Sequence, residues 1–229
     1  MLRRGNRGPR ATGTTILASV LAVATAASLS ACTTMEPHRD ELEGLKRSVI
    51  MLIEPNSMEQ SVLAEIYQQV LQSEGRTTSL RVDPESGVKG RIDAISSGEV
   101  DFIIDCSGPM LEYVDSAAAN ELAQEYAAAG ANPNAGDLAE RTYDAFVGSL
   151  PGSLATPDPS TAEGCATEGT QRLPHSIVPV YYRELFNRRE TQALNKATRD
   201  LTTADLKELV ESAQRESSIS TVVAEWLAY

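Results

Sequence analysis

Residues 94–108, AISSGEVDFIIDCSG, predict a short buried strand at the centre of this chain. A helical pattern ends in Ser-Ser-Gly, an apolar run covers residues 100–104, and the run breaks into Asp105, Cys106 and Ser107. A short apolar run that follows a helix is typical of a central strand in a parallel sheet. Ligands of open α/β sheets bind at the carboxyl ends of such strands. We therefore predict that Asp105, Cys106 and Ser107 line a ligand-binding site.

The residues before this strand alternate between strand and helix. An apolar run predicts a strand at residues 48–53, and a half-polar run predicts a second strand at residues 77–82. Helical spacing predicts helices at residues 57–73 and 88–95. This alternation predicts an α/β fold with an open, doubly wound and mostly parallel sheet.

The first of these helices begins at a second candidate position for ligand binding. Ser57 and Gln60 have the spacing of a capping box, in which both side chains satisfy free backbone amides. Asn56 and Ser57 precede a helix N-terminus, where a carboxylate of a ligand would be stabilised. Capping alone is the competing interpretation of both residues.

Beyond residue 108 the chain becomes rich in Ala, and later in Pro and Gly. Proline at position 179 lacks an amide donor, so the strand that contains it is predicted to lie at a sheet edge or to be irregular. Residues 47–108 and 173–229 are predicted to form one α/β lobe, with residues 109–172 as a helical and loop insertion. Helices are expected at residues 110–114, 117–129, 137–147, 191–198, 202–210 and 220–229, a loop at 148–170, and a strand at 177–182.

Residues 1–31 have the features of a secretory signal peptide. Four arginines precede an apolar stretch that ends on small residues, and Leu-Ser-Ala-Cys follows at Cys32. This tetrapeptide resembles a bacterial lipobox, which predicts cleavage before Cys32 and lipid on its thiol. The alternative is an ordinary signal peptide whose cleavage happens to precede a cysteine. Residues 32–46 are predicted to be a lipidated tether that holds the chain outside the cytoplasm, at the cell membrane.

The charge of the mature chain limits its partners. Cleavage removes four of the 20 basic residues and none of the 32 acidic ones, so the mature net charge is −16. Such a surface repels nucleic acid and anionic lipid, so we predict no nucleic-acid partner and anchoring through acyl chains.

The two remaining cysteines are predicted to pair. Once Cys32 carries lipid, Cys106 and Cys165 form an even number in a compartment that permits disulfides. The alternative is two free buried thiols.

Several sequence blocks resemble the glycine betaine and osmoprotectant-binding proteins of ABC importers, which have the type II periplasmic-binding fold. The blocks occur in the same order as in that family: PNSMEQSVLAEIYQQVLQSEG, IDAISSGEVDFIIDCSG, TPDPSTAEGC, HSIVPVYYRELF, LTTADLKELV and VVAEWL. The resemblance implies an extracytoplasmic receptor for a small zwitterionic or cationic solute, with ABC permease subunits as partners. The implied ligand-binding residues are Asn56, Ser57, Asp105, Cys106, Ser107, Ser176, Tyr181 and Tyr182.

Two departures from the family pattern bear on function. The segment between Cys165 and Leu173 is far too short for the family's second lobe, because domains need at least about 50 residues. The family also has aromatic residues where this chain has Ser57 and Cys106, and aromatic faces are what bind a quaternary ammonium. The alternative function is therefore a receptor lobe that acts as an interaction lipoprotein of the cell envelope without transport.

We expect no enzymatic activity and no cofactor or metal. The sequence contains no Gly-rich phosphate loop, no paired-histidine metal motif and no nucleophile elbow. His175 could activate Cys106 only if Cys106 stayed reduced. Tyr181 and Tyr182 remain open between two interpretations, walls of a ligand cage or packing of the core.

Overall fold

The computed structural model describes residues 48–82, 87–128, 136–165 and 172–228. These residues form a five-stranded sheet in the order β2-β1-β3-β5-β4. β1 pairs in parallel with β2 and β3, whereas β5 is antiparallel to both β3 and β4. Four strands therefore point the same way, which confirms the mostly parallel α/β fold. The strands are β1 (Val49–Ile53), β2 (Thr78–Val82), β3 (Phe102–Cys106), β4 (Leu154–Ala155) and β5 (Ile177–Tyr182).

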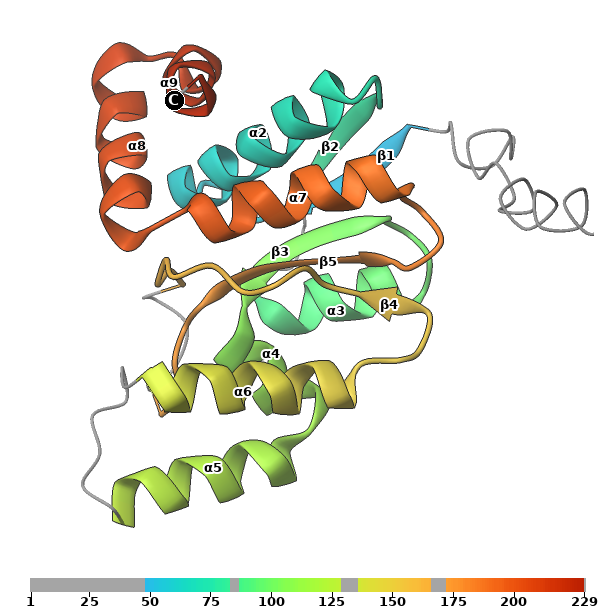
Figure 1. Ribbon diagram of the computed structural model, residues 1–229, viewed down its shortest axis with the longest axis vertical. Coiled ribbons are helices and arrows are strands. Elements are labelled where there is room, and N and C mark those ends of the chain that lie inside the picture. Colours follow the sequence, from blue (N-terminus) through green and yellow to red (C-terminus); the bar gives the residue numbers. More distant parts are fainter. Residues whose placement is uncertain (1–47, 83–86, 129–135, 166–171, 229) are drawn as a thin grey trace, which may run out of the picture. The chain divides into compact units, whose positions relative to one another are not determined.

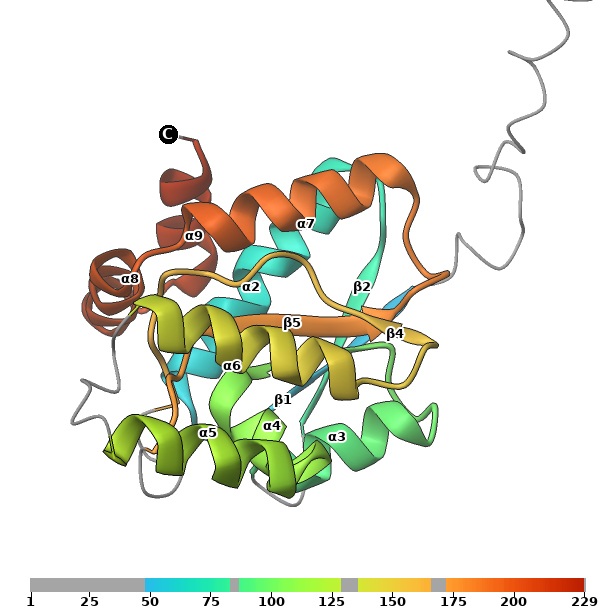
Figure 2. The same ribbon diagram turned by 60° about the horizontal axis from the view of Figure 1, so that its bottom comes forward.

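Helices cover both faces of this sheet, as expected for a doubly wound fold. Figures 1 and 2 show α2 and α7 on one face and α3 to α6 on the other, and α8 and α9 pack beside α2. The helices are α2 (Met58–Ser73), α3 (Val88–Ser96), α4 (Ser107–Val114), α5 (Ser116–Ala128), α6 (Gly136–Ser149), α7 (Arg188–Asp200), α8 (Thr203–Glu216) and α9 (Ile219–Leu227).

Two hydrophobic cores lie on the two faces because successive strand side chains alternate in direction. Met51 and Ile104 enter the core under α2 and α7, while Leu52 and Ile103 enter the core under α3 to α6. Burial on both faces explains why the central strands are continuously apolar. The segment 109–172 supplies α5, α6 and β4, so it contributes to both a helical layer and the sheet.

The predicted signal peptide and the tether at residues 32–46 lie outside the described residues. Among the helices that the structure describes, each is too short or too polar to cross a membrane.

Pro179 lies in an interior strand, so the predicted edge position of that strand is wrong. The Ile177 amide donates to the Ala162 carbonyl (3.0 Å), so the odd-numbered amides of β5 face away from β3. The nitrogen of Pro179 lies on that outer side, where the neighbouring β4 has already ended. Its missing N–H therefore removes no hydrogen bond between β5 and β3.

The capping box at the start of α2 forms only in part. The Ser57 hydroxyl accepts a hydrogen bond from the Gln60 amide (3.1 Å), as predicted. The Gln60 side chain donates instead to the Ile104 carbonyl of β3 (3.2 Å). This long-range contact fixes the start of α2 against the central strand.

Candidate functional site

The strand β3 runs two residues further than predicted, through Asp105 and Cys106. Both residues are fully buried and belong to the ladder, where Asp105 faces Val178 and Cys106 faces Ile177. The polar break predicted at Asp105 is therefore the buried carboxyl end of the strand, and α4 begins directly at Ser107.

Asp105 is paired with a cation that the chain itself supplies. The Nε atom of Arg91 on α3 donates to Oδ2 of Asp105 at 2.6 Å, and the Cys106 amide donates to Oδ1 at 2.7 Å. Both side chains of the ion pair are fully buried, and Glu54 at the end of β1 lies 3.6 Å from the Arg91 guanidinium. A guanidinium therefore occupies the position where a cationic ligand would meet this carboxylate.

The predicted disulfide between Cys106 and Cys165 is present, with 6.2 Å between the Cα atoms. It ties residues 160–165, which we call the strap, to the carboxyl end of β3. The strap follows the start of β5, because the Gly164 amide donates to the His175 carbonyl (3.1 Å). The Cys165 amide donates to Glu59 Oε1 in the first turn of α2 (2.9 Å). The strap is thus held at β3, α2 and β5, and runs beside the start of β5 to the carboxyl end of β3.

The chain that returns after the strap packs closely against the start of α4. The Ser107 amide donates to the Ser176 carbonyl (2.9 Å), and the Ser107 hydroxyl donates to the Pro174 carbonyl (3.4 Å). A Cβ atom at Gly108 would come within 2.6 Å of that Pro174 oxygen, so the approach requires glycine here. Ser107 and Ser176 are both buried, and the chain's own backbone satisfies the Ser107 hydroxyl.

Asn56 and Ser57 lie at the same end of the sheet. Asn56 is exposed and adopts a left-handed backbone conformation (φ 60°), which Asn tolerates better than most residues. Ser57 is half-buried and caps α2. The strand ends therefore gather Asn56, Ser57, Asp105, Cys106, Ser107 and Ser176.

Tyr181 and Tyr182 lie at the opposite end of the sheet. Since β5 is antiparallel to β3, Tyr181 pairs with Phe102 while Ile177 pairs with Cys106. Four residues of strand separate the two positions by about 13 Å. The sequence could not show this separation, because strand direction depends on how the chain returns after the strap.

Both tyrosines have partners within the fold. The Tyr181 ring stacks on Phe102 (centroids 5.9 Å apart, interplanar angle 11°) and meets Phe186 edge-on at 5.0 Å. The Tyr182 hydroxyl donates to the carbonyl of Ile95 at the end of α3. Their predicted ligand-binding role would require both rings to leave these contacts.

Tyr181 makes stability depend on alkaline pH. Burial is the main cause that raises the pKa of Tyr181 from 10.0 to about 12. The folded state thus retains a proton that the unfolded state releases near pH 10. The contribution of this group to the free energy of unfolding is therefore complete below pH 10 and disappears as the pH rises to 12. We expect the urea midpoint to fall over this interval and Tyr181→Phe to reduce the fall. Tyr143, whose pKa burial also raises to about 12, leaves a residual fall. An identical pH profile for Tyr181→Phe would contradict this assignment.

The chemistry of this site does not suit catalysis through Cys106. Its sulfur is bonded to Cys165, so it cannot form a thiolate, and His175 Nδ1 lies 3.2 Å from the Gly164 carbonyl. The two Cys Sγ atoms, of Cys106 and Cys165, and a carboxylate oxygen of Asp105 lie within 4.8 Å of one another, close enough to share a metal ion. The disulfide removes both sulfurs from that role and Arg91 faces the carboxylate, so the oxidised site does not fit a metal.

Arg91 and Glu59 are the residues that sequence reasoning missed. Arg91 occupies the apolar stripe of α3 between Val88 and Ile95, at positions i, i+3 and i+7. An arginine in an apolar stripe predicts a buried ion pair, and Asp105 after an apolar strand offers its partner. Glu59 gives no such signal, because an acid in the first turn of a helix is ordinary.

Comparison with solved structures supports the fold described above. The structure of apo YehZ from Escherichia coli matches with a TM-score of 0.60 at 14% identity, covering 79% of this chain and 98% of that chain. A glycine betaine/carnitine/choline ABC transporter structure matches with a TM-score of 0.58 at 10% identity, covering 80% of this chain and 97% of that chain. At these identities the likeness shows the fold alone, which this chain shares with both structures over about 80% of its length.

No protein-family model matches the chain, and no curated protein matches it either.

Proposed function

We propose that the chain is a lipid-anchored extracytoplasmic lobe of the solute-receptor type, which acts by contact with the membrane subunits of an ABC uptake system. The fold and the order of its sequence blocks support the receptor type, and the signal peptide with Cys32 supports the anchor. The observation that carries the proposal is the strap, which is joined to β3 by the disulfide and to α2 by Glu59.

Three features of the chain favour contact with a protein partner over capture of a solute. A quaternary ammonium cannot donate hydrogen bonds and needs aromatic faces around its charge. The tyrosines proposed for that purpose pack about 13 Å from the strand ends, and Asp105 already faces Arg91. The segment between the strap and the return, residues 166–171, is too short to contain a second lobe that could close over a solute, because domains need at least about 50 residues.

The second candidate function is the osmoprotectant receptor itself. The solved structure with a TM-score of 0.58 is named for glycine betaine, carnitine and choline, and Asn56 remains exposed at the strand ends. Under this alternative, Asn56, Ser57, Asp105, Ser107 and Ser176 would hold the solute after the strap moves.

Calorimetric titration separates the two functions. Mature chain carrying Cys32→Ser is titrated with glycine betaine, choline, carnitine and proline, with melting temperature measured in parallel. We expect no heat of binding and no rise in melting temperature, with or without reductant. Saturable micromolar binding by the oxidised chain would establish the receptor function and refute the proposed one.

Photo-crosslinking in cells tests whether the carboxyl ends of the strands form the surface that contacts the membrane subunits. A photoreactive residue in place of exposed Asn56 is expected to crosslink to an integral membrane subunit of an ABC importer. The same residue at Leu80, which is 44% exposed on the edge strand β2, serves as the control. Equal crosslinking from both positions would contradict a contact surface at the strand ends.

The lipid anchor is tested by detergent partitioning. We expect the wild-type chain to enter the detergent-rich phase and Cys32→Ser to remain in the aqueous phase, because about 0.8 kcal/mol is gained per buried acyl CH₂ group. Mass spectrometry of the first mature peptide gives the modification directly. Equal partitioning of the two chains would show that Cys32 carries no acyl chains.

A further inference from the structure

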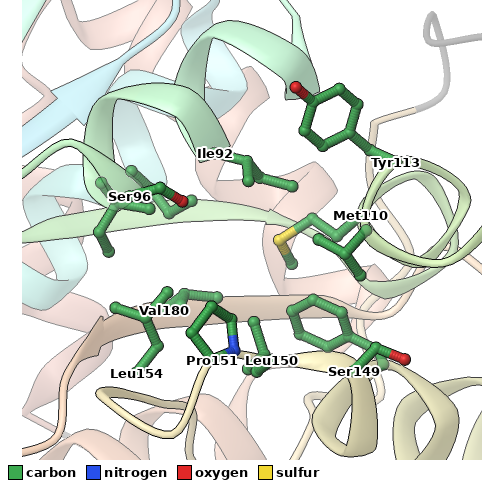
Figure 3. Close-up of a pocket in the computed structure, with 13 residues that line it drawn as sticks. Ile92, Ser96, Met110, Tyr113, Ser149, Leu150, Pro151, Leu154 and Val180 are labelled. Carbon is green, nitrogen blue, oxygen red and sulfur yellow. The ribbon is translucent and has the colours of Figure 1, made fainter.

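A cavity of about 450 Å³ opens on the face of the sheet covered by α3 to α6. Figure 3 shows its lining, with Ile92 and Ser96 from α3, Met110 and Tyr113 from α4, and Val180 from β5. None of the predicted ligand-binding residues at the strand ends lines it. The cavity is therefore separate from the site described above.

The inner walls of the cavity are buried and apolar. Ile103 of β3 and Val180 of β5 form the floor, and Ile95, Met110 and Phe146 close the sides from three helices. Each of these side chains is at most 1% exposed. Because five elements line the space, it is a recess between the sheet and the helices, with buried inner walls and an open mouth, and not a flat apolar patch.

Polar contacts connect the helix α3 to the other walls of the cavity. The Tyr113 hydroxyl of α4 donates to Asp93 of α3 (2.7 Å), and Lys89 pairs with the same carboxylate. Two residues further along α3, the Tyr182 hydroxyl donates to the Ile95 carbonyl. The second half of α3 is therefore tied both to α4 and to β5, which form other walls of the cavity.

The lining determines which ligands can bind. All thirteen lining residues are uncharged, although 23% of the whole chain is charged. A charged ligand would lose its hydration without gaining a counter-charge in the lining. The hydroxyl side chains are those of Ser96, Tyr113 and Ser149, and the last two already bond to other groups of the chain.

We propose that this cavity binds a small, uncharged apolar molecule. Its volume lies within the roughly 300–1,000 Å³ of small-molecule sites. The release of water from its apolar walls favours an apolar ligand. A protein segment would bring backbone amides that the lining cannot satisfy. This site does not depend on the proposed function.

Fluorescence titration with N-phenyl-1-naphthylamine, an uncharged apolar probe, tests the cavity. The mature chain carrying Cys32→Ser is used so that neither detergent nor acyl chains compete. We expect saturable binding of one probe per chain at micromolar concentration, displacement by dodecanol, and no displacement by choline. Absence of saturable binding in the folded chain would overturn the proposal.

Matched tryptophan substitutions locate the bound probe. Ser96→Trp introduces an indole at the mouth, and Ser149→Trp does so from the opposite wall on α6. Both are expected to weaken binding at least tenfold. Ser97→Trp, one residue from Ser96 but outside the lining, should change it by less than twofold. Far-UV circular dichroism checks folding, and unchanged binding in a folded mouth variant would place the probe elsewhere.

Discussion

Arg91→Met is expected to lower the free energy of unfolding by about 3–5 kcal/mol, because it leaves the carboxylate of Asp105 buried beside Cys106 without its guanidinium. Loss of one partner of a buried ion pair costs far more than loss of both, since the remaining charge keeps its full desolvation penalty. The double variant Arg91→Met with Asp105→Leu should therefore recover much of the lost stability. Urea denaturation at neutral pH measures all three chains.

An exposed ion pair provides the matched control. Arg81 lies 3.1 Å from Glu99, and both side chains are about half exposed. Arg81→Met should cost less than about 1 kcal/mol, as is usual for surface pairs. If Arg91→Met costs no more than Arg81→Met, the buried pair does not have the structural role assigned to it.

Reduction of the disulfide is expected to lower the free energy of unfolding by about 4 kcal/mol, because the bond closes a loop of about 60 residues in the unfolded chain. The double variant Cys106→Ser with Cys165→Ser should reproduce this loss without reductant. Urea midpoints measured with and without reductant give the comparison.

Amide hydrogen exchange tests which part of the sheet opens more often when the disulfide is reduced. The Ile177 amide, which is bonded to the strap at Ala162, should exchange faster after reduction. The Leu52 amide lies in the centre of the sheet, away from the strap, and serves as the internal control. Equal midpoints in the two redox states would contradict the stabilisation assigned to the disulfide.

Local sequence patterns predicted the elements of this fold well. The run at residues 100–104 and the spacing after Ser57 both reflect side-chain periodicity, which depends only on nearby residues. The disulfide followed from counting cysteines, because Cys106 and Cys165 are the pair that is left once Cys32 is assigned to the predicted lipid anchor. These features require no knowledge of how distant segments meet.

The parts that sequence reasoning missed depend on long-range geometry. Pro179 suggested an edge strand, but which side of β5 its nitrogen faces is set by pairing with β3 and the strap. The same antiparallel pairing separates Tyr181 from Asp105. Arg91 meets Asp105 across a helix–sheet interface, and only its position in an apolar stripe hinted at burial.

The packing of α9 on α2 determines when the apolar surface of α2 is covered during synthesis and folding. The Gln69 side chain donates to the Ser220 carbonyl at 2.9 Å across 151 residues, and Val222 and Val223 enter the same core as Leu63. The layer of α3 to α6 uses residues synthesised earlier, whereas the core over α2 is incomplete until α9 has been synthesised. A chain that emerges from its amino end therefore exposes apolar surface on α2 until α9 arrives, and a truncation before α9 leaves that surface uncovered.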